Sequence, residues 1–223
     1  MFDTNSPDIG KDLIYIHTVI TRGLYVAQGY SHSSTQAVHL NEAKRKGFIS
    51  YVKSLISVMS GHLQFEDKIV YPYLKYRMPE VPFDMLKTQH QDMMNNLDSI
   101  VKIVDEAASN RSFGKSLGIL NMEFRKTQEI WHSHIQIEAK YLTAEKIGAV
   151  IGYGEQKMLS RIFNQYIHEH AGPDNLVVPF LIYNLPPEER AVFSKKIPPA
   201  LAKQVTSDAW KEKWMPMSTF MLL

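Results

Sequence analysis

The sequence predicts an all-α protein, an up-down-up-down four-helix bundle followed by a C-terminal helical extension. Apolar residues recur at steps of three and four through four long segments, which is the spacing of an amphipathic helix. Short breaks rich in Gly, Ser, Asn or Pro separate these segments, and short connections favour antiparallel neighbours. Seven prolines in the last third of the chain mark off the extension.

The composition narrows the functional classes. A chain of 223 residues with 44% hydrophobic residues can bury a large core, so we expect one compact globule. The 25 basic and 23 acidic residues are interspersed, which argues against a nucleic-acid partner. The absence of cysteine excludes disulfides, thiolate metal sites and iron-sulfur clusters, and leaves imidazole and carboxylate as metal ligands.

No apolar run reaches membrane-spanning length, and the first residues lack the basic patch and apolar core of a signal peptide. We therefore expect a soluble, cytoplasmic protein with no membrane partner.

The first two helices each place histidine in an apolar stripe. The first is expected from Asp8 to about Gln28, where the stripe contains Leu13, Ile16, His17, Ile20 and Leu24, and a break follows over residues 29–34. The second is expected from about Asn41 to Lys75, with the seam Phe48, Tyr51, Leu55, Val58, His62, Glu66, Ile69 and Tyr73. Because Pro72 would clash with the carbonyl four residues back, this helix should kink or loosen near Lys68.

The third and fourth helices repeat the pattern. After the stop at Pro79 and Pro82, a helix should begin near Phe83, with the seam Leu86, His90, Met93, Leu97, Ile100 and Val104. The fourth should end before Thr143, with the seam Leu117, Leu120, Phe124, Thr127, Trp131, His134, Glu138 and Tyr141.

The last third of the chain has a different residue pattern. One more helix is expected from about Glu155 to His170, after which the prolines divide the chain into short pieces that remain rich in large apolar side chains. That density favours a folded flap packed on the bundle. We therefore predict a bundle domain over residues 8–150 and an extension over residues 151–223.

Six polar residues occupy the predicted core seams: His17, His62, Glu66, His90, His134 and Glu138. Each His-x3-Glu pair places an imidazole and a carboxylate one turn apart on one helix face. Each histidine could instead be a hydrogen-bonded core residue and each glutamate an exposed neighbour. However, two unpaired buried carboxylates would cost several kcal/mol each, and the seams offer no Lys or Arg. A metal is the natural counter-ion, and the mixed donors suit iron, manganese or zinc.

The order of these residues resembles the HHE cation-binding domain of the hemerythrin-like proteins, in which a lone His, a His-x3-Glu, a lone His and a second His-x3-Glu arrive on successive helices. The resemblance covers residues 12–142, and the remainder looks like the C-terminal extension of stand-alone fungal members. It implies two iron ions bridged by Glu66 and Glu138, with His17 and His62 on one iron and His90 and His134 on the other. It also implies dioxygen as a ligand or co-substrate.

The sequence also departs from the family pattern. Oxygen-carrying hemerythrins have a second His four residues after the third-helix ligand, and Met94 stands there in this chain. Open coordination positions therefore remain at the metals. His168 is a candidate seventh ligand, although a surface role at a helix C-terminus, shared with His170, is the alternative. We expect His32 and His39 to be solvated and His132 to point away from the site.

Two functions follow from the resemblance. The first is a di-iron oxidase or oxygenase that uses dioxygen to oxidise a small organic substrate beneath a roof formed by the extension. The second is a carrier or sensor of dioxygen or iron without turnover. A cavity wide enough for an organic molecule beside the metals would favour the first function, and a sealed apolar pocket would favour the second.

Overall fold

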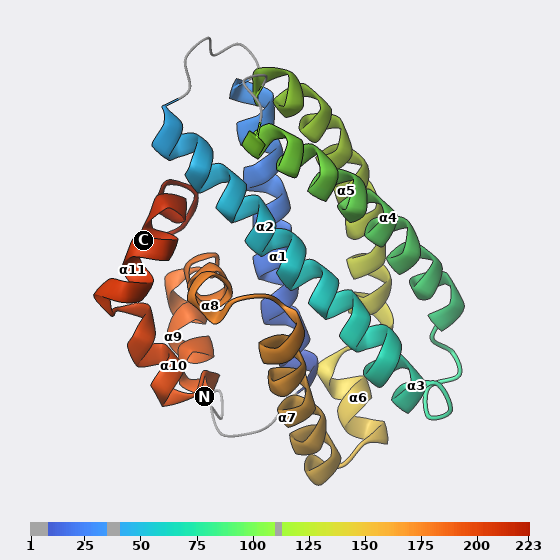
Figure 1. Cartoon of the computed structure of the whole chain (residues 1–223). Coiled ribbons are helices and arrows are strands. Elements are labelled where there is room, and N and C mark those ends of the chain that lie inside the picture. Colours follow the sequence, from blue (N-terminus) through green and yellow to red (C-terminus); the bar gives the residue numbers. More distant parts are fainter. Residues whose placement is uncertain (1–8, 35–40, 110–112) are drawn as a thin grey trace.

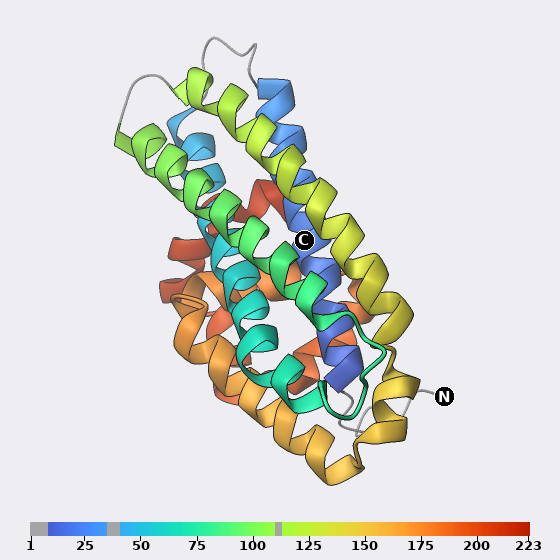
Figure 2. The same cartoon turned by 90° about the vertical axis from the view of Figure 1, so that its right-hand side faces the viewer.

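The computed structural model describes residues 9–34, 41–109 and 113–223, and these residues form helices and loops without a strand. Four long helices make the bundle: α1 (Ile9–Ser34), α2 (Glu42–Phe65), α4 (Phe83–Ser109) and α5 (Phe113–Tyr141). Each packs along two others, in the ring α1, α2, α4, α5 and back to α1. Consecutive helices are thus neighbours, and the predicted all-α bundle with extra C-terminal helices is confirmed (Figure 2).

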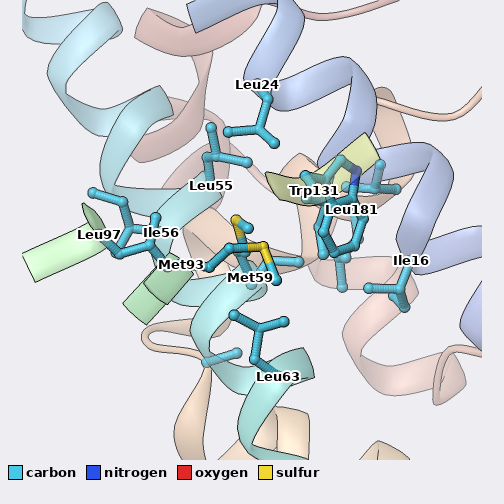
Figure 3. Close-up of a cluster of buried hydrophobic side chains, with 14 of the residues drawn as sticks. Ile16, Leu24, Leu55, Ile56, Met59, Leu63, Met93, Leu97, Trp131 and Leu181 are labelled. Atoms are coloured by element: carbon cyan, nitrogen blue, oxygen red, sulfur yellow. The ribbon is translucent and has the colours of Figure 1, made fainter. Parts of the chain in front are cut away.

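The bundle core is built from the predicted apolar seams. Leu24 of α1, Leu55 and Met59 of α2, and Met93 of α4 are all buried, and they belong to one continuous cluster (Figure 3). The same seams carry the buried histidines and glutamates toward one end of the helices, so packing of the apolar residues fixes the height and rotation of the polar ones.

Helix α1 is longer than predicted. It continues through the expected break at residues 29–34 and ends at Ser34. The hydroxyl of Ser31 donates to the carbonyl of Ala27, and the ring of Tyr30 packs on Phe48, with 4.5 Å between centroids. Tertiary packing and local hydrogen bonds thus outweigh the poor helix propensity of these residues.

The second predicted helix is interrupted at the expected place. A π-helical turn, η1 (Glu66–Val70), follows α2, and a short helix, α3 (Tyr71–Leu74), completes the segment. The predicted distortion near Lys68 is therefore confirmed. The seam beyond it was predicted wrongly, because the extra residue in the π turn buries Val70, Tyr71 and Leu74 and leaves Ile69 and Tyr73 half-buried.

The chain continues in short helices after the bundle: α6 (Ala144–Val150), α7 (Tyr153–His170), α8 (Asp174–Tyr183), α9 (Pro187–Phe193), η2 (Ser194–Lys196), α10 (Pro199–Val205), α11 (Asp208–Trp214) and η3 (Met215–Phe220). The orange and red helices of the extension lie together on the side of the bundle away from α4 (Figure 1). They pack mainly on α2 and α1. The predicted boundary at residue 150 falls at the end of α6 and stays a prediction.

A buried polar network fastens the extension to the bundle. Arg22 of α1 donates to the carbonyl of Phe220 at 2.9 Å and also to Asn184 Oδ1. Tyr51 of α2 donates to the same Asn184 oxygen at 2.7 Å, and Asn184 is fully buried. These hydrogen bonds join both bundle helices to the middle and the C-terminal part of the extension, because Asn184 follows α8 and Phe220 ends η3.

Helix α2 also meets η3 at backbone distance. A Cβ atom on Gly47 would lie 1.9 Å from the carbonyl oxygen of Pro216, so only glycine permits this contact. Among the described residues, no helix is both long and apolar enough to cross a membrane.

Candidate metal centre

The four bundle helices bring the six predicted residues together. His17 comes from α1, His62 from α2, Glu66 from the first position of η1, His90 from α4, and His134 and Glu138 from α5. They fall into two groups that could each hold an ion: His17, His62, Glu66 and Glu138, and Glu66, His90 and His134. Glu66 belongs to both groups.

The histidines face each other in pairs through their Nε2 atoms. His17 Nε2 and His62 Nε2 are 3.2 Å apart, and His90 Nε2 and His134 Nε2 are 3.3 Å apart. Two donor atoms that share a metal at about 2.1 Å lie roughly 3.0–3.4 Å apart. Both spacings thus suit two nitrogens bound to one ion.

The two carboxylates lie between the histidine pairs. Glu66 Oε2 is 3.4 Å from both His62 Nε2 and His90 Nε2. Glu138 Oε2 is 3.1 Å from His17 Nε2 and 3.3 Å from His134 Nε2. Each carboxylate therefore touches one histidine from each pair, which is the placement a bridging ligand needs.

Buried polar atoms without a hydrogen-bond partner indicate whether the histidine–glutamate cluster suits a cation. Glu66 is fully buried, and in the part of the chain that the structure describes, its Oε1 atom and the Nδ1 atom of His62 have no hydrogen-bond partner. Buried polar atoms without a partner are rare in folded proteins, and the basic partners of both carboxylates are histidines. The donor set fits a bound cation.

Burial and charge set the protonation states that a metal would meet. Burial, together with neighbouring His17, holds the pKa of His62 well below its usual value, so its ring is neutral and can offer a lone pair. Burial and the charge of Glu138 raise the pKa of Glu66 well above its usual range. The raised pKa favours the protonated form of Glu66, and a cation bound there would compete with that proton.

Comparison with known proteins adds the family. The model of the hemerythrin HHE cation binding domain matches residues 11–144, which is more than half of the chain. The chain belongs to this family. Comparisons with curated proteins and with solved structures gave no match. All six clustered residues lie within the matched hemerythrin domain.

Tyr71 is the residue at this hemerythrin-type site that the sequence pattern did not reveal. Its hydroxyl donates to Glu138 Oε1 at 2.7 Å and lies 3.3 Å from His90 Nε2 and 3.5 Å from Glu66 Oε2. Burial and the charge of Glu138 raise the pKa of Tyr71 well above its usual value. The available signal was Pro72, which predicts the distortion but not the rotation that follows from it.

Two further side chains contact the outer nitrogens, Nδ1, of His90 and His134. Asp67 Oδ1 lies 3.0 Å from Nδ1 of His90, a close charge contact that lacks hydrogen-bond geometry, and Gln89 Oε1 lies 3.3 Å from Nδ1 of His134. Such partners fix the orientation of an imidazole whose other nitrogen faces a metal. Trp131 stacks on His134 at 5.7 Å between centroids and forms an apolar wall beside the cluster.

The remaining histidines lie outside the cluster. His168 is exposed, its Nδ1 atom lies 3.0 Å from Asp174, and it belongs to neither ligand group. His132, His170 and His32 are exposed as well, while His39 lies outside the described residues.

A small cavity reaches the ligands from outside. It has a volume of about 170 Å³ and is lined by Gly10, Leu13, Ile14, His17, Glu138, Ala139, Leu142, Thr143 and Ala144. All of these residues precede position 151, so the lining does not include the extension. The expected roof over this space is therefore not provided by residues 151–223 in the described structure.

A larger cavity of about 470 Å³ lies within the extension itself. Its wall is mainly apolar, with His168 and Asp174 among the polar lining residues. It shares no lining residue with the cavity at the metal cluster. The larger space is thus separate from the ligands.

Proposed function

We propose that this hemerythrin HHE-domain protein holds two iron ions and binds dioxygen at them. The observation that carries the proposal is the convergence of two histidine pairs on two carboxylates, each of which contacts one histidine of each pair. His17 and His62 would bind one iron, His90 and His134 the other, and Glu66 and Glu138 would bridge. When bound, iron supplies one-electron chemistry with dioxygen that zinc, the second choice for these donors, cannot supply.

The chain contributes orientation and exclusion of water. Asp67 and Gln89 hold His90 and His134 by their outer nitrogens, so the inner nitrogens keep their direction. Trp131 covers one side, with its indole nitrogen anchored on the Thr21 hydroxyl at 2.9 Å. An apolar wall of this kind keeps bulk water away from the reacting centre.

The size of the cavity limits what reaches the site. A volume of about 170 Å³ accommodates a few water molecules or a molecule the size of dioxygen. Pockets for organic ligands are usually about 300–1,000 Å³. A bulky organic substrate beside the metals is therefore disfavoured, and an oxidised substrate would have to be small or deliver electrons from outside.

Turnover of dioxygen is the version of this function that we favour, and Tyr71 is the reason. The buried Tyr71 hydroxyl lies among the proposed ligands and donates to Glu138 beside the cavity, and an oxygen donor at this place favours oxidised iron. The second candidate is a dioxygen carrier or sensor. The small cavity favours it, because a narrow space excludes substrates that would consume bound dioxygen.

Metal analysis tests the ligand assignment. Purified protein should contain about two metal ions per chain, chiefly iron. The ligand variants Glu66→Gln and Glu138→Gln should contain less iron. The variant Glu129→Gln, at an exposed position of α5, is the control and should retain it. Zinc in place of iron in protein produced with both metals supplied would contradict the proposal.

Oxygen exposure separates turnover from carriage. Reduced, iron-loaded protein is mixed with dioxygen, which is then removed under argon while the visible spectrum is followed. We expect oxidation that is not reversed when oxygen is removed, and reduction only after a chemical reductant is added. Repeated reversible cycling would favour the carrier instead.

A further inference from the structure

We propose that the phenol oxygen of Tyr71 is a seventh protein ligand of the metal centre, bound to the ion held by His90 and His134. This assignment deepens the proposed function and rests on its two-iron site. It replaces His168, which lies away from the cluster, as the source of the additional ligand.

The first support is the helical register. In the π turn, the amide of Tyr71 bonds to the carbonyl of Glu66, five residues back. In a regular α-helix each residue adds about 100° of rotation, so residue 71 would face away from residue 66. The extra residue in the turn restores the alignment, and Tyr71 stands one turn beyond Glu66 on the same face.

The second support is the surroundings of the hydroxyl. It lies within 3.5 Å of three proposed ligand atoms, on Glu138, His90 and Glu66. The ring is 1% exposed, stacks on His90 with 5.3 Å between centroids, and packs against Phe83. The 3.3 Å spacing to His90 Nε2 matches that expected between atoms that share a metal, roughly 3.0–3.4 Å, and the 3.5 Å spacing to Glu66 Oε2 is slightly longer.

The third support is the imbalance between the two groups. Glu138 touches His134 as well as His17, but its oxygen groups with those of His17, His62 and Glu66, so fewer ligand atoms gather closely around His90 and His134. The nitrogen ligand expected on α4 is replaced by Met94, which is only partly buried and packs against the core. Tyr71 reaches the group around His90 from another helix and adds a ligand atom to it.

Coordination changes one bond and moves one proton. On binding iron(III), the phenol would lose its O–H proton as the oxygen–iron bond forms. The proton would leave to solvent through the small cavity that Glu138 lines. No electron is transferred in this step.

An anionic phenol ligand favours iron(III) over iron(II), because it adds negative charge at the higher-charged ion. The centre should therefore be hard to reduce and quick to reoxidise. This property suits a protein that turns over dioxygen and is unfavourable for reversible carriage.

The test compares diferric wild-type protein with the variant Tyr71→Phe. Phenolate bound to iron(III) gives a charge-transfer band in the visible range, and excitation within it enhances tyrosinate vibrations in the Raman spectrum. We expect both signals in the wild type and their loss in Tyr71→Phe, with the reduction potential shifted to more positive values. The control is Tyr73→Phe, which removes a hydroxyl bonded to Glu155, away from the site, on the same segment.

The outcomes separate the two proposals. Two irons per chain with no tyrosinate signal in the wild type, or with a signal that persists in Tyr71→Phe, would refute the ligand assignment and leave the di-iron proposal intact. Fewer than two irons in the wild type would instead refute the di-iron proposal. If Tyr71→Phe fails to fold, Raman spectra of wild-type protein grown with ring-deuterated tyrosine show whether a tyrosinate binds iron, and absence of that signal refutes the assignment. Tyr71 is the tyrosine whose hydroxyl contacts three of the proposed ligand residues.

Discussion

The two His-x3-Glu motifs are alike in sequence and differ in their surroundings. His62 and Glu66 lie where α2 turns into a π-helix, and both side chains are fully buried. His134 and Glu138 lie within the regular helix α5, and Glu138 borders the cavity that reaches the site. One motif thus forms the closed side of the centre and the other its open side.

The difference has an electrostatic consequence. Burial, followed by the charge of Glu138, raises the pKa of Glu66. Burial also acts to raise the pKa of Glu138, but His134 and His17 outweigh it and hold that pKa well below its usual range. Identical motifs therefore supply one carboxylate that resists ionisation and one that is already ionised.

The largest expected effect comes from removing the shared carboxylate. Glu66→Gln should lower iron content from about two per chain to near zero, because Glu66 belongs to both ligand groups. Glu138→Gln should retain more iron, because Glu138 contacts one histidine of each pair but lies in only one of the two close ligand groups. Iron measured per chain checks both variants against Glu129→Gln, and greater loss in Glu138→Gln would reverse the assignment of the closed and open sides.

In the metal-free protein, the opposite pKa shifts of Glu66 and Glu138 should have opposite effects on the free energy of unfolding. A raised pKa in the folded state means that Glu66 destabilises the fold as pH rises above about 4.5, its usual value. A lowered pKa means that Glu138 stabilises the fold above that pH, and that this contribution is lost as pH falls through its folded pKa.

Denaturant unfolding of metal-free protein across acidic and neutral pH measures these effects. At neutral pH, Glu66→Gln should be more stable than the wild type and Glu138→Gln less stable, each by roughly 1–3 kcal/mol. The differences should shrink in acid, where both carboxylates are protonated. Destabilisation of equal size in both variants at neutral pH would show that the two sides do not differ.

The sequence was sufficient for the presence of the four bundle helices, though not for the end of α1 or the turn after α2, and for the six clustered residues. A polar residue on an apolar seam is visible from spacing alone. His17 and His90 are examples, since each replaces one apolar residue in its stripe. Seam positions after Pro72 were not predictable in the same way. A proline forecasts a distortion, but whether the turn tightens, kinks or widens depends on the packing around it.

The access route and the role of the extension also required the structure. The cavity beside His17 is formed by residues from the start of α1 and the region around the end of α5, which are far apart in sequence. The network of Arg22, Tyr51 and Asn184 likewise joins three distant segments. No local pattern encodes such contacts, because they arise only when the helices have packed.

Replacing Pro72, the expected cause of the π turn, should make the helix after Glu66 regular, as it is around Glu138. Pro72→Ala restores an amide and removes the clash with the carbonyl of Lys68, so an α-helical turn becomes available. We expect Tyr71 to rotate away from the ligands while most of the iron is retained, with a change in the visible spectrum. Lys75→Ala, at an exposed position of the same segment, is the control. A spectrum identical to that of the wild type would show that the turn does not depend on Pro72.

The smallest effects are expected from the residues that contact the outer nitrogens of the histidines, which differ in charge. His90 is held by the carboxylate of Asp67 and His134 by the neutral amide of Gln89. A carboxylate increases the basicity of the imidazole more than an amide does, so Asp67→Asn should weaken iron binding by about 10-fold or somewhat more. Gln89→Ala should have a smaller effect, because it removes only a long hydrogen bond. Iron affinity determined by competition with a chelator measures both variants. Equal losses would mean that the charge of Asp67 contributes nothing beyond orientation.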